Sequence, residues 1–173
     1  MKLTDLLPLE EWARIEEEIC NESGLDASVF GPDGMKITKF KKWANSLCPV
    51  IKANEKGLSF ICAVANQTMT KEVAQTKEPL VSGCDAGLLR IAVPICVDDE
   101  FLGTVGACGR ILEDNEVESF LINKTTGIDE DEIRRLSTDI QPVSAGEAQT
   151  IADNIDERIK GVVENFQKES RKQ

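Results

Sequence analysis

The chain has 173 residues, of which 41% are hydrophobic, and a formal net charge of −11. This length fits one domain with an apolar core of its own, and the acidic charge excludes the basic surface that nucleic acids and anionic membranes require. Histidine is absent, which removes Ser-His-Asp and Cys-His catalysis and histidine-ligated metal centres. We therefore do not expect an enzyme.

The first predicted elements are a helix and a hairpin. Pro8 suits a first helical turn, and the helix is expected to reach Cys20, because apolar residues recur along it at nearly helical spacing: Leu9, Trp12, Ile15 and Ile19. The segment "GPDG" has proline and glycine where a turn prefers them. The residues before it and "MKITKF" after it are therefore expected to pair as two strands.

From residue 41 to residue 78 the pattern is mainly helical. The run "LSFICAVA" within this segment fits a strand or a helix, because periodicity does not separate the two in a short apolar run. A second hairpin follows, in which apolar residues alternate from Leu89 to Val97, "DDE" makes the turn, and the chain returns from Phe101 to Arg110. The returning strand contains three glycines, which predicts close approach by a backbone or a ligand.

The last predicted helix begins at Ser144, with Glu147 as its capping-box partner. Its apolar residues form a heptad seam that packs on its own domain or pairs with a second copy of the chain: Ala148, Ala152, Ile155, Ile159, Val162 and Phe166. We divide the chain into a domain at 1–143 and a helix at 144–173 for dimerisation or signalling.

The order of the elements predicts an α+β fold with an antiparallel sheet, helices packed mainly on one face and a long C-terminal helix. A five-stranded, PAS-like sheet fits this order. The N-terminal segment lacks the apolar core of a signal peptide, and no run approaches the roughly 20 apolar residues of a membrane span. We therefore expect a cytoplasmic protein with reduced thiols and no membrane partner.

The six cysteines divide into two groups. Cys20 lies at the end of the row of apolar residues on the first helix, and Cys96 lies within a strand. Both are therefore interpreted as structural. The other four each lie near the boundary of a predicted element, where they can converge in space: Cys48, Cys62, Cys84 and Cys108. Four thiolates form a tetrahedral site for zinc or an iron–sulfur cluster, although the chain has no C-x₂-C pair, the usual spacing for such ligands.

Three segments resemble the PocR sensory domain: "GLDASVFGPDG", "NSLCPVIKANEKGLSFICAVAN" and "CDAGLLRIAVPICVDDEFLGTVGACG". The resemblance covers about residues 3–112. Its most specific parts are Cys48, Cys62 and the motif residues of the segment from Cys84 to Gly106. It implies a PAS-like, ligand-binding domain of prokaryotic signal transduction that senses small organic molecules such as diols. In this family the sensor is usually attached to a DNA-binding domain or a kinase; 173 residues leave no room for one, so we expect a free-standing sensor subunit or an excised domain. The chain departs from the family at Asp85, where histidine is common.

Four hypotheses follow from these residues. The first is a sensor whose pocket lies between the glycine-rich sheet face and the helices of 41–78, with ligand contacts from Cys62, Cys84, Asp85 and Gly106. The second gives the sensing role to zinc or an iron–sulfur cluster on Cys48, Cys62, Cys84 and Cys108. The third is a redox switch without metal, in which two cysteines pair reversibly, and an enzyme ranks last. The expected partners are a small organic molecule and an output protein, either a kinase or a transcription regulator, or a second copy of the chain through its last helix.

Overall fold

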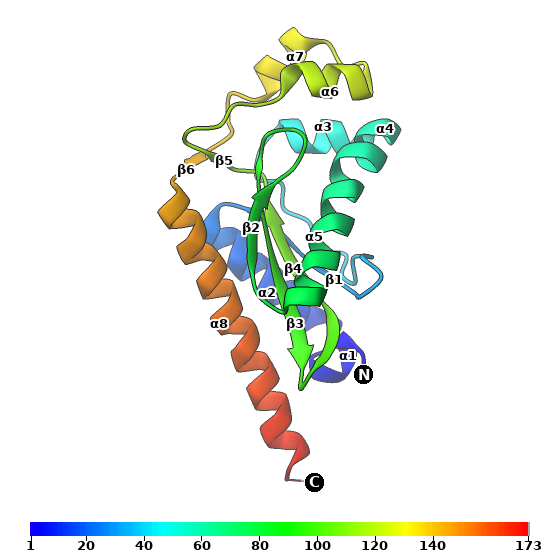
Figure 1. The fold of residues 1–173 in the computed structure, drawn as a ribbon, viewed down its shortest axis with the longest axis vertical. Helices are drawn as coiled ribbons and strands as arrows, with labels where there is room; N and C mark the ends of the chain where they lie inside the picture. The colour runs from blue at the N-terminus through cyan, green and yellow to red at the C-terminus, as the bar shows by residue number, and fades with distance from the viewer. Residues whose placement is uncertain (173) are drawn as a thin grey trace.

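The computed structural model describes residues 1–172, which are built around a four-stranded antiparallel sheet (Figure 1). The strands lie in the order β1–β4–β3–β2, with bounds β1 (Asp26–Phe30), β2 (Leu80–Gly83), β3 (Leu89–Val97) and β4 (Glu100–Cys108). The hairpin predicted around "DDE" is thus confirmed as β3 and β4. A separate parallel pair joins two short strands, β5 (Ile111–Leu112) and β6 (Pro142–Val143).

The two faces of the sheet differ chemically, because successive side chains along a strand point to opposite faces. The register pairs Cys108 of β4 with Asp26 of β1 on one side and with Arg90 of β3 on the other. These three residues therefore form one polar row across three strands. The opposite face carries the buried apolar residues of the same strands: Ala27, Val29, Ile91, Val93, Val105 and Ala107.

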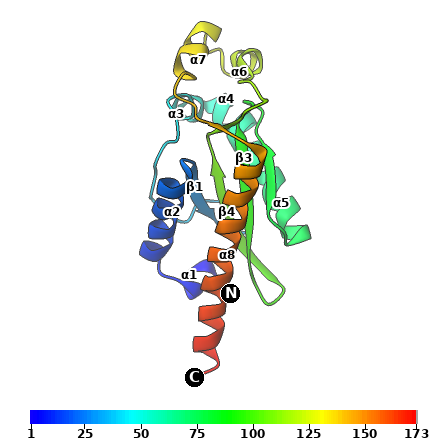
Figure 2. The ribbon, with the colours of Figure 1, turned by 90° about the vertical axis from the view of Figure 1, so that its left-hand side faces the viewer.

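Two helices cover the apolar face, α2 (Leu9–Ser23) and α8 (Ala145–Ser170) (Figure 2). The backbone N–H of Glu147 donates to the Ser144 hydroxyl at 3.1 Å, which caps α8 as expected. The first two-thirds of the heptad seam is buried in the core of the chain: Ala148, Ala152, Ile155 and Ile159. The seam thus packs on its own domain, and a coiled coil through these residues requires α8 to leave the sheet. A further short helix, α1 (Leu3–Leu6), adds to the same core.

A helical segment that is interrupted at Asn54 lies on the polar side of the sheet, and its last helix covers the polar face (Figure 1). It comprises α3 (Leu47–Ala53), α4 (Glu55–Gly57), a π-helical turn η1 (Leu58–Cys62) and α5 (Ala63–Thr76). The run "LSFICAVA" is therefore helical. In α5, Met69 and Val73 pack against Ala92 of β3. Two further helices, α6 (Ser119–Thr126) and α7 (Glu130–Leu136), join α3 and α4 at one end of the molecule. None of the helices in residues 1–172 is long and apolar enough to cross a membrane.

The predicted hairpin after β1 is wrong in its second strand. "MKITKF" joins β1 through a single bridge between Phe30 and Lys36. The ladder stops there because the backbone N–H of Val29 donates to the buried carboxylate of Glu16 at 2.6 Å instead of to a strand. The hydroxyl of Thr38 donates to the same carboxylate. The sheet consequently has four strands in the described residues, where five were expected.

The buried carboxylate of Glu16 predicts a pH dependence of stability. Burial raises the pKa of Glu16 above its ordinary value of 4.5, although hydrogen bonds from Thr38 and Val29 act in the opposite direction. The folded chain then holds a proton that the unfolded chain has released, so the contribution of Glu16 to stability is present below pH 4.5 and is lost as the pH rises through its raised pKa. Glu16→Gln should remove this fall in the free energy of unfolding, measured by urea titration across that range.

The control for this measurement is Glu10→Gln, which removes an exposed carboxylate from the same helix. It reports the effect of one lost charge without the loss of a buried acid. Equal pH dependence of the wild type and Glu16→Gln would contradict the interpretation.

Candidate functional site

Two adjoining cavities lie between the polar face of the sheet and the helical segment α3–α5. We call them the outer chamber, with a volume of about 210 Å³, and the inner chamber, with a volume of about 30 Å³. Five residues line both, which makes them parts of one site: Asp26, Lys52, Cys62, Arg90 and Cys108. The pocket expected between the sheet and the helices of 41–78 is thus present as a cavity.

The inner chamber is surrounded by thiols. Its wall contains cysteines from α3, from the end of the π-helical turn, from the loop after β2 and from the end of β4: Cys48, Cys62, Cys84 and Cys108. The other walls are largely apolar, from Ile51, Ile61, Ala86 and Leu88. The structure therefore brings together the four cysteines that the sequence selected. Within residues 1–172, however, no three cysteine or carboxylate side chains are arranged to hold a metal ion.

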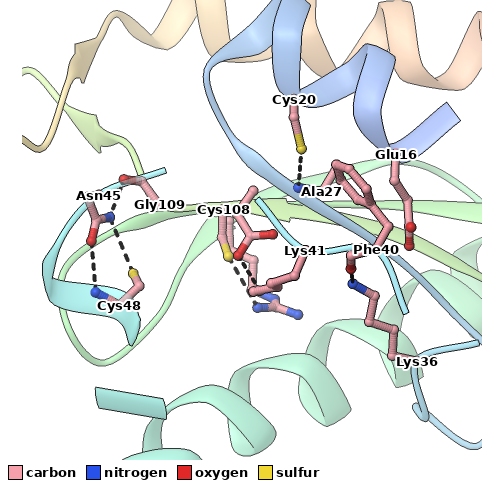
Figure 3. A network of polar contacts seen from close by, with 12 residues as sticks. Glu16, Cys20, Ala27, Lys36, Phe40, Lys41, Asn45, Cys48, Cys108 and Gly109 are labelled. Carbon is pink, nitrogen blue, oxygen red and sulfur yellow. Dashed lines mark hydrogen bonds and ion pairs between the residues drawn. The ribbon is translucent and has the colours of Figure 1, made fainter. Parts of the chain in front are cut away.

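Asn45 fixes the position of Cys48 (Figure 3). Its side-chain oxygen accepts hydrogen bonds from the backbone N–H groups of Leu47 and Cys48 at 2.9 and 2.8 Å, which caps the start of α3. Its amide nitrogen donates to the carbonyl oxygen of Gly109 at 2.7 Å and lies 3.3 Å from the Cys48 sulfur. Because Gly109 follows Cys108, one amide side chain holds α3 against the end of β4. Sequence reasoning missed Asn45, although an asparagine before a helix is a capping signal.

Cys84 is held by a tight turn between β2 and β3, closed by a 2.9 Å hydrogen bond from the N–H of Gly87 to the carbonyl of Cys84. Gly87 has a φ of 86°, and a Cβ there would lie 2.3 Å from the carbonyl oxygen of Glu116, so this turn requires glycine. Asp85, expected to contact ligand, is exposed in the same turn and lines neither chamber. The turn thus directs the cysteine, and not the aspartate, to the site.

Burial raises the pKa of three of these cysteines, Cys48, Cys62 and Cys84. Desolvation raises the pKa of Cys48 far above its ordinary value of 9.0, and the neighbouring Cys108 adds to the effect. Desolvation also raises the pKa of Cys62, to about 11, and that of Cys84, where backbone hydrogen bonds from Leu88 and Ala86 act in the opposite direction. Near pH 7 these three cysteines are therefore neutral thiols, and ionising them costs more than ionising a thiol in water.

Two buried charged residues that sequence reasoning missed line both chambers. Arg90 has 7% of its surface exposed, and its guanidinium donates to the Asn66 side-chain oxygen at 2.7 Å and lies 3.8 Å from the Cys108 sulfur. Asp26 is 5% exposed and forms an ion pair with Lys41. The sequence did contain a signal for Arg90, which is the one charged residue of an otherwise apolar strand. Because charged side chains are rarely buried without a partner, such a position indicates a specific contact.

Gly106, another expected ligand contact, does line the outer chamber. A Cβ at this position would lie 3.0 Å from the Phe30 ring and 3.5 Å from the Arg90 guanidinium. The absence of a side chain therefore makes room for two side chains of the protein itself. The glycine pattern predicted close approach, and here the approaching groups come from the same polar face.

The remaining two cysteines lie outside both chambers. Cys20 is buried in α2, where its sulfur accepts a hydrogen bond from the Ala27 N–H at 3.3 Å (Figure 3). Cys96 is half-buried near the opposite end of β3 from Arg90. Both positions agree with a structural interpretation of these residues.

The fold and the cavity together define a small α+β domain that carries an interior site between its sheet and its helices. A family model described as the sensory domain found in PocR matches residues 5–165. The chain therefore belongs to the PocR sensory-domain family, as its resemblance predicted, and the match extends through most of α8. No curated protein matches the chain.

The raised pKa of Cys62 predicts slow alkylation. A pKa of about 11 in place of 9.0 lowers the thiolate fraction near pH 7.5 by about 100-fold, and the thiolate is the form that reacts. Iodoacetamide should therefore modify Cys62 at least about 100-fold more slowly in the folded chain than in the urea-unfolded chain. Peptide mass spectrometry over time measures both rates, and equal rates would contradict the described environment.

Proposed function

We propose that this sensory domain binds a small organic molecule in the outer chamber. The single observation that carries the proposal is the chamber itself. Its volume of about 210 Å³ is smaller than the roughly 300–1,000 Å³ of sites for drug-sized ligands, so it fits a smaller organic molecule. Its wall combines apolar surface from Phe30, Met35 and Leu58 with a few polar groups, the composition of small-molecule sites. The sensory family to which the chain belongs supports the same function.

We further propose that ligand binding is communicated through β3 to an output protein, a kinase or a transcription regulator, in the cytoplasm. One face of β3 presents Arg90 to the chambers, and the other presents Ile91 and Val93 to the core that α8 completes. A displacement of Arg90 by ligand therefore acts on the strand that supports α8. Because the early part of its seam is buried, the exposed side of α8 is the surface that a partner would contact.

Filling the outer chamber should abolish ligand binding. Ala63 lines this chamber at the start of α5, so Ala63→Leu places three additional carbon atoms in it. A thermal-shift screen of small alcohols, aldehydes and acids should find ligands that raise the Tm of the wild type, as ligand binding to the folded state requires. Ala63→Leu should lose this response.

The matched control is Val64→Leu, because Val64 is the adjacent residue and is exposed. It should retain the ligand-induced shift. If no compound in the screen stabilises the wild type, the proposed function is wrong.

A second candidate function is a sensor that holds zinc or an iron–sulfur cluster in the inner chamber. The four cysteines around that chamber favour it, because four thiolates are the donor set that zinc and such clusters prefer. Binding requires the four thiols to lose their protons and to close on the metal, because their present arrangement does not form a metal site in residues 1–172.

Anaerobic purification followed by visible absorption and metal analysis tests this candidate. Bound metal in the wild type should fall by at least half in Cys48→Ser and remain unchanged in Cys20→Ser, which alters a buried cysteine outside the chambers. Colourless, metal-free protein would remove the candidate. Mass measurement of the same samples with and without reductant then tests the redox switch, since reversible pairing of two thiols removes two hydrogen atoms.

A further inference from the structure

Arg90 brings a permanent positive charge into the wall of the site. Arginine is not deprotonated in proteins and has five N–H donors. The guanidinium nitrogens of Arg90 contact Asn66 and Cys108, but its buried Nε has no hydrogen-bond partner among residues 1–172. A buried donor without a partner is costly, and a donor next to a cavity can be satisfied by an acceptor bound there.

Asp26 presents the complementary feature. One of its carboxylate oxygens pairs with Lys41, whereas Oδ1 is buried and has no hydrogen-bond partner in the described chain. Only one other buried side-chain atom there is unpartnered, the Nε of Arg110. That arginine lines neither chamber and is held by hydrogen bonds to Ser23, Glu147 and Pro142. Two of the three such atoms therefore belong to the wall of a single site.

The strand register sets the spacing of Asp26 and Arg90. They lie two strands apart in one row, with Cys108 between them. The guanidinium of Arg90 already reaches the Cys108 sulfur, at 3.8 Å. About one strand spacing, roughly 5 Å, therefore remains between the charged end of Arg90 and the strand of Asp26. A molecule of a few carbon atoms with polar groups at both ends spans this gap.

The charges at the site favour an anionic group, although the whole chain is acidic. Arg90 and Lys52 are the cations of the outer-chamber wall, and Asp26 and Asp33 are its anions. The charge of Asp26 is offset by its ion pair with Lys41. With Lys41 included, three cations face two anions, so one positive charge remains for a ligand to balance.

From these observations we infer that the ligand is a small hydroxycarboxylate. Its carboxylate accepts hydrogen bonds from Arg90, and its hydroxyl donates to the free oxygen of Asp26, which has to turn toward the chamber because it is buried in the ligand-free chain. This inference rests on the proposed function, because it names the chemical class of the ligand in the same chamber. It gives Arg90 and Asp26 separate roles, one for the anionic end of the ligand and one for its hydroxyl end.

The experiment compares three chain lengths of probe by calorimetric titration, at an ionic strength matched with sodium chloride. The hydroxy acids are glycolate, 3-hydroxypropionate and 4-hydroxybutyrate. Each is compared with the diol of equal carbon number, which lacks the carboxylate, and with acetate, propionate or butyrate, which lacks the hydroxyl. At least one hydroxy acid should bind about tenfold more tightly than both of its analogues, the ratio that one charge-assisted hydrogen bond provides.

Two variants assign the two ends of the ligand. Arg90→Gln should reduce binding of the hydroxy acid about tenfold or more and leave the diol unaffected, whereas Asp26→Asn should reduce the advantage of the hydroxy acid over the simple acid. Arg14→Gln is the control, because it removes an exposed arginine far from the site. If Arg90→Gln does not fold, Arg90→Lys replaces it, since lysine keeps the charge but loses the planar donor set and should weaken the hydroxy acid alone.

The outcomes separate this inference from the proposed function. Equal binding of a diol and its hydroxy acid, or hydroxy-acid binding that is unchanged in both Arg90 variants, overturns the inference and leaves a small-molecule sensor in place. If compounds of another class bind and no hydroxy acid does, the inference is likewise overturned and the proposed function remains. If neither these probes nor the wider screen of alcohols, aldehydes and acids gives any binding, both proposals fail.

Discussion

The alternation of side chains in β1, β4 and β3, held in one register, is the constraint on which the rest of this structure depends. Because the pairing places Asp26, Cys108 and Arg90 in one row, the residues next to them in the three strands, Ala27, Ala107 and Ile91, point to the other face. A shift of one residue in this register would turn the polar row into the core beneath α2 and α8. Burial of the apolar face by these two helices therefore also fixes the geometry of the site.

Three acidic or basic side chains are buried in the interior of this chain, and a specific contact holds each of them. Glu16 ends the ladder beside β1, Asp26 pairs with Lys41, and Arg90 is held by Asn66. Removing such groups from water is costly, so their burial requires partners in the protein or in the chamber. The inner chamber shares these charged walls but adds buried cysteines, and desolvation raises the pKa of three of them, Cys48, Cys62 and Cys84. The site thus joins a wider chamber to a smaller one lined by thiols, and its charged residues lie in the wall that the two chambers share.

Several elements could be predicted because their signals are local. The hairpin of β3 and β4 follows from strict alternation around an acidic turn, and the start of α8 follows from the Ser144 cap. The failed strand after β1 shows the limit of this reasoning, since "MKITKF" has a strand pattern. Glu16, ten residues before the start of β1, takes the hydrogen bond that such a strand would need. A local sequence pattern does not reveal that an acceptor from another element will take a hydrogen bond of the strand.

The sequence by itself determined the α+β class and the family, because composition, periodicity and motif residues are properties of the chain, and it singled out four cysteines that the structure places around one chamber. Only the tertiary structure decided that Arg90 and Asp26 share a wall with those cysteines, and that Asp85 does not. It also decided that α8 uses its seam within its own domain. The physical reason is the same in each case. A side chain's partners depend on the strand register and on the helices that cover each face, which bring together residues far apart in the chain.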